Sequence, residues 1–490
     1  MTENLKNKKY LLKISLIWFA LTLVAYLLRG LISSEKLLKG LCIETTVVFA
    51  LVFYHLWKWK GTPFKVVTLF VLMCFLYLQG QVLLDTFDLT KDGLLSGKFS
   101  PRELVGGILA VHVFLSLLLT AISSAKGQKR KFFRGRENLA DETVVLAGTI
   151  IALCALPFEL YVNLTKLKFT LTDGYASLYQ EAALAAIPSG AKILSYFFLP
   201  GCFYLFFGSA RKSRAEYAAL LGIVAHGAVE LLIGYRASAV IPLLLVIYGI
   251  GVKNRYEKSA VKRKKNRRTI FLLCALGALV VLVVFPVVRA TRNSGGLAAL
   301  TWRDIFSVEN VRSIFSTVND MGKSLQTVIY TLRLVPEEEP FRYGVTYLVN
   351  LTEIFPNFFW AVHPAEAYGS LGRWLTKIVD YSFWQYGGAL GYSCVAEAYI
   401  NFGYFGILAF AFLLGRVLEK TESKIDAADN AAWYASWAIV ATDLLFYPRG
   451  EFSSLVRGIF WYMLLPLLFC RILRRIGGKD KKKYSLQRQF

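Results

Sequence analysis

The 490-residue sequence is short of charged residues and lacks paired cysteines and nucleotide-binding motifs, and each absence argues against a class of protein. Charged residues make up 18% of the chain, against about 25% in an ordinary soluble domain. The seven cysteines lie mostly inside apolar runs and form no CxxC pair, which argues against a disulfide framework or a zinc motif. There is no Walker A motif and no GxGxxG after a strand pattern, so no nucleotide site is predicted. No metal or cofactor is expected. What remains, 56% hydrophobic and 15% aromatic residues, favours a membrane protein.

The apolar residues are concentrated in runs of roughly twenty, the length that crosses about 30 Å of hydrocarbon. We predict an all-α polytopic membrane protein with about twelve transmembrane helices. The first run is too long for a cleaved signal peptide, and no small-residue cleavage site follows it. The run at 215–252 is interrupted only by Gly234, Tyr235 and Arg236, which predicts two short helices joined by a tight turn. The predicted spans are 11–32, 38–57, 64–84, 104–124, 142–161, 191–208, 215–234, 237–252, 269–288, 398–418, 431–447 and 456–474.

Basic residues distinguish the two sides of the membrane. The net charge is +24, and Lys and Arg cluster in 125–136, in 253–268 and in the C-terminal tail. Retention of basic residues in cytoplasmic loops explains this pattern if the number of spans is even and both termini are cytoplasmic. The clusters are then anchors at the anionic leaflet, and nucleic-acid binding is not expected. Shorter external loops are predicted at 85–103 and 162–190.

One external loop, 289–397, between the ninth and tenth spans, is much longer than the others. A structureless stretch of this length would be unusual, so we expect short helices and a function in it. Segments 308–335 and 345–360 show helical or mixed apolar spacing. The predicted organisation is nine helices in 1–288, an extracytoplasmic loop domain in 289–397, three helices in 398–474 and a basic cytoplasmic tail in 475–490.

Arginines at the external ends of the spans are the first candidate binding groups. The positive-inside rule disfavours arginine there, so topology does not explain their presence. Guanidinium groups bind phosphate and pyrophosphate through paired hydrogen bonds. For any single arginine, contact with a lipid headgroup or a nearby carboxylate is an equal alternative. For the set, we predict an anionic ligand held in one shared pocket at the outer interface. The set is Arg236, Arg289, Arg292, Arg449 and Arg457.

A glycine-rich segment, 386–403, precedes and enters the tenth predicted span. Glycine permits sharp turns and close backbone approach, so we predict a loop or half-helix that dips toward the membrane. Such irregular backbone is tolerated at that depth where it lines a wet cavity. Glu397 is then a buried or cavity-facing carboxylate and a functional candidate. The alternative is that Glu397 is a structural partner for one of the arginines.

The four histidines are isolated from one another. His55, His112 and His226 lie within predicted spans, where we expect each to face a neighbouring helix. His363 lies in the long loop, either as a general base or as a loop hydrogen-bonding group, and we favour the second. The external region is also rich in Trp and Tyr, which suit both the membrane interface and sugar stacking.

These features together resemble the bacterial oligosaccharide repeat-unit polymerases of the Wzy type, which extend O-antigen and related surface polysaccharides. The matching features are the Gly234-Tyr235-Arg236 turn before an apolar span and Arg289 and Arg292 at the start of the large loop. The run Gly387 to Gly406 adds Gly-x-Ser, Glu-Ala-Tyr and Asn-Phe-Gly-x-x-Gly elements, and Arg449 is a late external arginine.

The resemblance implies a GT-C-like membrane glycosyltransferase architecture in the bacterial cytoplasmic membrane. It implies that donor and acceptor are oligosaccharides on undecaprenyl pyrophosphate, used without a metal, with a flippase and a chain-length regulator as possible partners. The growing glycan moves from its lipid carrier onto the non-reducing end of a new repeat unit.

On that resemblance, residues receive expected roles. Arg236, Arg289 and Arg292 bind the pyrophosphate and offset the charge that develops as it leaves. Arg449 joins them or orients the acceptor. Glu397 or Glu451 is the base on the acceptor hydroxyl, if a base is needed. Substrate contacts are further expected from Tyr392, His363 and Arg457.

Two other functions stay open at the level of the sequence. An O-antigen ligase shares the topology and the lipid-pyrophosphate donor but transfers the glycan to a lipid A core. A flippase or transporter is less favoured, because transporters usually contain two similar halves with interrupted helices in matching places. Here one dominant loop lies in the second half, without a counterpart in the first.

Overall fold

The computed structural model describes residues 3–90, 93–126, 139–256, 308–355 and 360–487, and every regular element in these ranges is a helix. Among them, ten helical stretches are long and apolar enough to cross a membrane. A polytopic all-α membrane protein is thereby confirmed. Predicted span 269–288 lies outside the described residues. Predicted span 431–447 corresponds to α20 (Ala431–Leu444), whose 14 residues make a helix of about 21 Å.

The chain divides into two compact units that are not continuous in sequence. Unit 1 consists of Met1–Gln128, Val311–Lys424 and Leu444–Val456. Unit 2 consists of Lys129–Asn310, Ile425–Asp443 and Arg457–Phe490. Each unit therefore combines early and late parts of the chain, and each is described by itself below.

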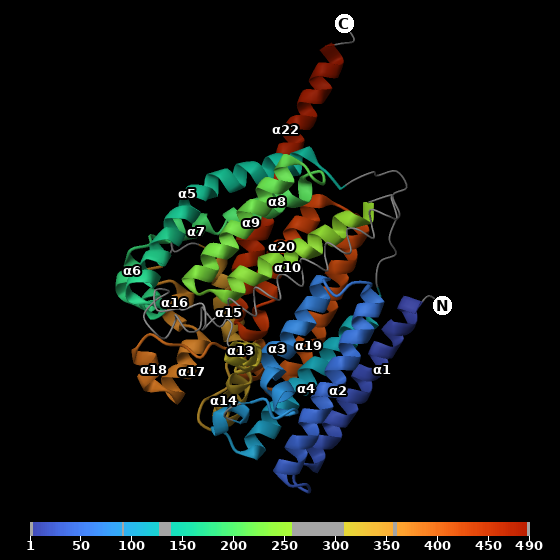
Figure 1. Ribbon diagram of the computed structural model, residues 1–490, viewed down its shortest axis with the longest axis vertical. Coiled ribbons are helices and arrows are strands. Elements are labelled where there is room, and N and C mark those ends of the chain that lie inside the picture. Colours follow the sequence, from blue (N-terminus) through green and yellow to red (C-terminus); the bar gives the residue numbers. More distant parts are fainter. Residues whose placement is uncertain (1–2, 91–92, 127–138, 257–307, 356–359, 488–490) are drawn as a thin grey trace. The chain divides into compact units, whose positions relative to one another are not determined.

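Unit 1 is built on four N-terminal helices and one late helix. Figure 1 shows α1, α2, α3 and α4 lying side by side, and α1 contacts both α2 and α4. Lys60, at the end of α2, binds Glu419 and Glu422 of α19 with N–O distances of 2.5 and 2.9 Å. This buried ion cluster links α2 to α19, the last long helix of the unit. The bounds are α1 (Glu3–Leu28), α2 (Ser34–Lys60), α3 (Val66–Asp85), α4 (Pro101–Ser124) and α19 (Cys394–Ala428).

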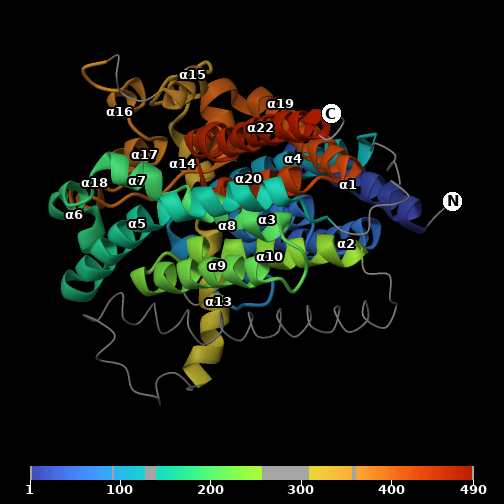
Figure 2. The same cartoon turned by 90° about the horizontal axis from the view of Figure 1, so that it is seen from above.

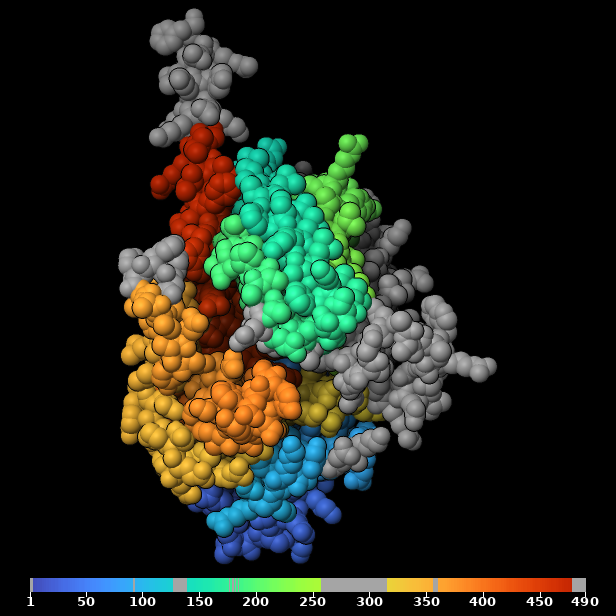
Figure 3. All heavy atoms as spheres, turned by 90° about the vertical axis from the view of Figure 1, so that its left-hand side faces the viewer, coloured from blue at the N-terminus to red at the C-terminus, as the bar shows by residue number. Residues whose placement is uncertain are grey.

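The described part of the predicted external loop contains short helices, as expected, and they belong to unit 1. Gln81 of α3 donates a hydrogen bond to the carbonyl of Asn319 in α13, at 3.0 Å. Ile329 of α14 lies directly against Gly107 of α4. Figure 3 shows the yellow and orange atoms of this segment as one continuous surface. The helices are α13 (Val308–Gly322), α14 (Leu325–Leu334), α15 (Val345–Leu351), η5 (Thr352–Ile354), α16 (Pro364–Tyr368), α17 (Leu371–Val379) and α18 (Tyr381–Gln385).

Unit 2 is organised around the pair α5 and α8. These two helices pack closely, because a Cβ atom at Gly148 or Gly201 would overlap the backbone of the partner helix. The hydroxyl of Tyr204 in α8 lies 2.9 Å from that of Ser436 in α20. The main helices are α5 (Glu142–Asp173), α7 (Ser189–Ser195), α8 (Phe198–Gly208), α9 (Arg214–Ile233), α10 (Arg236–Lys253), α20 and α22 (Leu465–Gln487).

Two boundaries in unit 2 test the sequence predictions. The tight turn at Gly234-Tyr235 is confirmed: α9 ends at Ile233, α10 begins at Arg236, and Figures 1 and 2 show the two helices side by side. The predicted end of the fifth span at 161 is too early, because α5 continues to Asp173. The continuation alternates apolar residues with Lys and Thr, a polarity that the hydropathy pattern assigned to a loop.

Candidate functional site

Helix α19 is interrupted near its start, so that residues 394–401 form the predicted half-helix. Gly403 has φ 61° and ψ −149°, a conformation that is essentially restricted to glycine. The carbonyls at the end of the half-helix find donors outside it: the amides of Arg342 and Tyr343 donate to Ile400 and Asn401, at 2.8 and 3.1 Å. The backbone at residues 342 and 343 thus closes the half-helix.

Glu397 lies on this half-helix and is completely buried. One carboxylate oxygen accepts hydrogen bonds from Thr346 Oγ1 at 3.2 Å and Asn350 Nδ2 at 3.5 Å. The other accepts the backbone N–H of Phe452 at 2.8 Å. Asn401 donates to Thr346 Oγ1 at 2.7 Å and completes the network. The carboxylate therefore joins the half-helix, α15 and the loop that contains Arg449.

Glu451 lies in that same loop and caps helix α17. Its two oxygens accept the backbone N–H groups of Leu371 and Gly372, at 3.0 and 2.9 Å. Burial and the charge of Glu353 raise the pKa of the Glu451 carboxyl, while the two backbone donors act in the opposite direction. Such contacts are those of a residue that holds backbone in place.

Tyr392 and Arg449 complete the group of predicted residues that unit 1 brings together. Arg449 lies beside Gly391, since a Cβ atom there would be 3.8 Å from Arg449 Nε. Tyr392 is buried, and its hydroxyl lies 2.9 Å from Thr331 Oγ1. Burial raises the pKa of Tyr392, the hydrogen bond with Thr331 opposes this effect, and the charges of Glu397 and Glu451 raise the pKa further.

Arg342 was not singled out in the sequence, although it lies in the predicted external loop, as Arg289 does. Its guanidinium lies over the ring of Trp374, 5.4 Å from the centroid, and forms an ion pair with Glu339 at 3.4 Å. Its amide closes the half-helix that contains Glu397. The pattern that selected the other arginines was their position at the ends of predicted spans, whereas Arg342 lies inside the predicted loop.

His363 has the contacts of a loop hydrogen-bonding residue. Its Nδ1 accepts the N–H of Ala365 at 3.2 Å and so caps α16, and its Nε2 lies 3.2 Å from the carbonyl of Phe355. One neutral tautomer, with the proton on Nε2, satisfies both contacts.

The remaining predicted arginines are not gathered in unit 1. Arg236 begins α10 and Arg457 ends α21 (Phe452–Arg457), and both are assigned to unit 2. Arg289 and Arg292 lie outside the described residues. A single pocket shared by the five arginines therefore stays a prediction.

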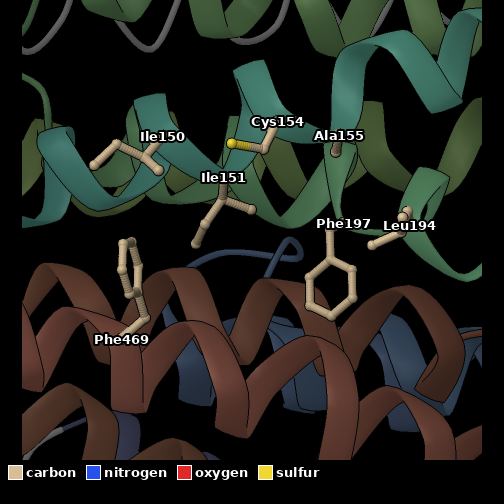
Figure 4. Close-up of a pocket in the computed structure, with 7 residues that line it drawn as sticks. All are labelled: Ile150, Ile151, Cys154, Ala155, Leu194, Phe197 and Phe469. Atoms are coloured by element: carbon tan, nitrogen blue, oxygen red, sulfur yellow. The ribbon is translucent and has the colours of Figure 1, made fainter.

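Unit 2 contains an apolar hollow of about 230 Å³. Figure 4 shows side chains of α5 on one side of the hollow and Phe469 of α22 on the other. The side chains that line it are hydrocarbon apart from one thiol, so it suits a hydrocarbon chain. The lining residues are Ile150, Ile151, Cys154, Ala155, Leu194, Phe197 and Phe469.

Chemically, the unit 1 group combines two buried carboxylates that accept protein hydrogen bonds, the Arg342 and Arg449 guanidiniums and the buried Tyr392 hydroxyl. Within the described ranges, no cluster of three or more His, Cys, Asp or Glu side chains is arranged to hold a metal ion.

Comparison with known proteins identifies the family. Neither a curated protein nor a solved structure matches the chain. The profile of the family described as "O-antigen polysaccharide polymerase Wzy" matches residues 10–481, which is nearly the whole chain and includes both units. With its many membrane-spanning helices, the chain therefore belongs to the Wzy family of O-antigen polysaccharide polymerases.

Proposed function

We propose that this protein polymerises oligosaccharide repeat units linked to undecaprenyl pyrophosphate, at the outer face of the bacterial cytoplasmic membrane. A hydroxyl of the new repeat unit attacks the anomeric carbon of the growing glycan, and the bond from that carbon to the pyrophosphate oxygen breaks. The lipid pyrophosphate leaves with the bonding electron pair. The family match over residues 10–481 is the observation that carries the proposal.

The arginines supply the positive charge that this reaction needs. A leaving pyrophosphate gains negative charge, which guanidinium groups stabilise through charge-assisted hydrogen bonds. We assign this role to Arg236 and Arg457 of unit 2 and to Arg289 and Arg292. To Arg449 of unit 1 we assign contact with a lipid-linked substrate. Tyr392 is buried, so we assign it a supporting role rather than a direct contact with the sugar.

Glu397 and Glu451 are positioning residues in this proposal. Both oxygens of each carboxylate already accept protein hydrogen bonds. A base must instead offer an accessible lone pair to the proton that it removes. The two carboxylates hold the half-helix, the Arg449 loop and α17 in a fixed arrangement.

The apolar hollow of unit 2, with a volume of about 230 Å³, suits a short stretch of the isoprenoid chain of such a substrate. Replacing Cys154 with Trp fills the hollow, so the KM for the lipid-linked repeat unit is expected to rise several-fold while kcat changes little. Steady-state polymerisation by the purified protein measures both constants. The matched control is Leu153→Trp, because Leu153 is 62% exposed and does not line the hollow. Equal KM values for wild type and Cys154→Trp would show that the hollow does not take the substrate.

The proposed function is tested with purified protein in lipid nanodiscs, where no ion gradient exists. The probe is the undecaprenyl-pyrophosphate-linked repeat unit extracted from the producing bacterium after deletion of this gene. The expected result is a ladder of longer lipid-linked glycans. Transfer only to an added lipid A core would identify a ligase instead, and the absence of any new glycosidic bond would favour a transporter.

A further inference from the structure

A buried polar cluster in the membrane-spanning part of unit 2 takes no part in the site described so far. His226 of α9 meets Glu159 of α5, with Nδ1 and Oε1 2.7 Å apart. Asn163, one turn further along α5, donates to the same carboxylate oxygen at 2.6 Å. Glu159 and Asn163 are 7% and 6% exposed. Ionisable groups in a membrane span are costly, and they commonly mark functional sites.

The partner of His226 distinguishes it from the other histidines of the spans. His55 contacts the neutral amide of Asn7 at 2.8 Å, and His112 contacts the hydroxyl of Thr45 at 2.9 Å. His112 is fully buried beside a hydroxyl, so a carboxylate partner is not required to bury an imidazole in this protein. A buried carboxylate adds a desolvation cost, and it adds the ability to stabilise a protonated imidazole.

The second ring nitrogen of His226, Nε2, can accept a proton from a substrate. Within the described part of the chain, Nε2 has no hydrogen-bond partner, and the side chain retains 13% exposure. A carboxylate that fixes Nδ1–H leaves the lone pair on Nε2, which is the arrangement of a general base with an orienting group.

The surroundings of this pair suit a sugar pyrophosphate. The Lys166 ammonium and the Glu230 carboxylate lie close enough to His226 to interact electrostatically with its imidazole. The Arg457 guanidinium and the Glu159 carboxylate interact in the same way with the Tyr196 hydroxyl. The apolar hollow begins close by, because Ala155, which lines it, precedes Glu159 by one helical turn. Cations, a base and a hydrocarbon site thus lie within one unit.

We propose that His226 is the catalytic base of the polymerase and that Glu159 is its positioning residue. The assignment rests on the proposed function. The acceptor O–H bond breaks and its proton moves to His226 Nε2, while the oxygen forms the bond to the anomeric carbon. The pyrophosphate departs with the electron pair of the broken C–O bond. Glu159 stabilises the imidazolium until the imidazolium releases its proton.

The test compares His226→Gln and Glu159→Gln with wild type in the nanodisc assay. General-base catalysis contributes about 10²–10⁴-fold, so His226→Gln is expected to lower kcat by that factor with little change in KM. Glu159→Gln is expected to lower kcat less. The control is His55→Gln, which removes an imidazole of similar geometry and is expected to leave kcat unchanged. Gel-filtration profile and thermal midpoint verify folding of each variant.

Two further readouts separate catalysis from a structural role. The wild-type rate should fall as the pH is lowered, because protonation of Nε2 removes the base, and His226→Gln should lack this acid limb. Added imidazole should partly restore kcat in His226→Ala. The same variant replaces His226→Gln in the kinetic comparison if His226→Gln does not fold. A folded His226→Gln with wild-type kcat would overturn the assignment of His226 as the base. So would a slow variant that keeps the acid limb and is not restored by imidazole. Both results would leave the proposed function unaffected. A wild-type protein that forms no polymer would overturn the proposed function and, with it, this role.

Discussion

Replacing Glu397 with alanine is expected to abolish polymer formation and to lower the thermal stability of the protein. The carboxylate is fully buried and accepts three hydrogen bonds, including the N–H of Phe452. Each buried donor left without an acceptor costs about 1–3 kcal/mol, and the lost side chain leaves a cavity. Yield, thermal midpoint and polymer ladder of the purified variant measure the effect.

The isosteric change Glu397→Gln separates positioning from proton transfer. The glutamine carbonyl can still accept from Phe452, so a positioning role predicts a folded enzyme that retains a substantial fraction of wild-type kcat. A well-folded Glu397→Gln with kcat reduced a hundredfold or more would instead make Glu397 the base, against our assignment. Glu338→Ala is the control, because Glu338 is exposed in the same predicted loop and donates to or accepts from none of the residues that bind the Glu397 carboxylate.

Replacing Gly403 with alanine is the second change with a large expected effect. A methyl group itself would fit, since its nearest neighbour would be a ring carbon of Phe341 at 3.5 Å. The backbone is the obstacle, because φ 61° with ψ −149° costs a residue with a Cβ about 1–3 kcal/mol. We expect α19 to straighten, the Glu397 network to separate and polymerisation to fall at least tenfold.

The control for Gly403 is Gly106→Ala. Gly106 lies inside α4 with open space around its Cα, so alanine there should be neutral or stabilise the helix by up to about 1 kcal/mol. Thermal midpoints and the polymerisation rates of the two variants are compared. Equal stability and activity of Gly403→Ala and wild type would show that the break in α19 is not required.

The helices and the turn at Gly234-Tyr235 could be predicted because local sequence controls them. Long apolar runs must become helices in hydrocarbon, where every backbone group needs an internal partner. The boundary at Asp173 was missed because the last turns of α5 carry Lys166 and Lys168, and hydropathy alone does not separate a polar helix from a loop.

The site was predictable only in part, because its residues are distant in sequence. Glu397 and the half-helix could be inferred from the glycine-rich segment. The capping of α17 by Glu451 joins positions 79 and 80 residues apart, and no local pattern records such a contact. His226 was expected merely to face a neighbouring helix, since its partner Glu159 lies 67 residues away.

The sequence by itself determined that this chain is a polytopic helical membrane protein and indicated its family, because hydropathy and short motifs are properties of contiguous residues. Only the tertiary structure decided which carboxylates hold backbone and which one holds a histidine. That distinction depends on which donor each carboxylate oxygen meets, and helix packing, rather than order along the chain, brings donor and acceptor together.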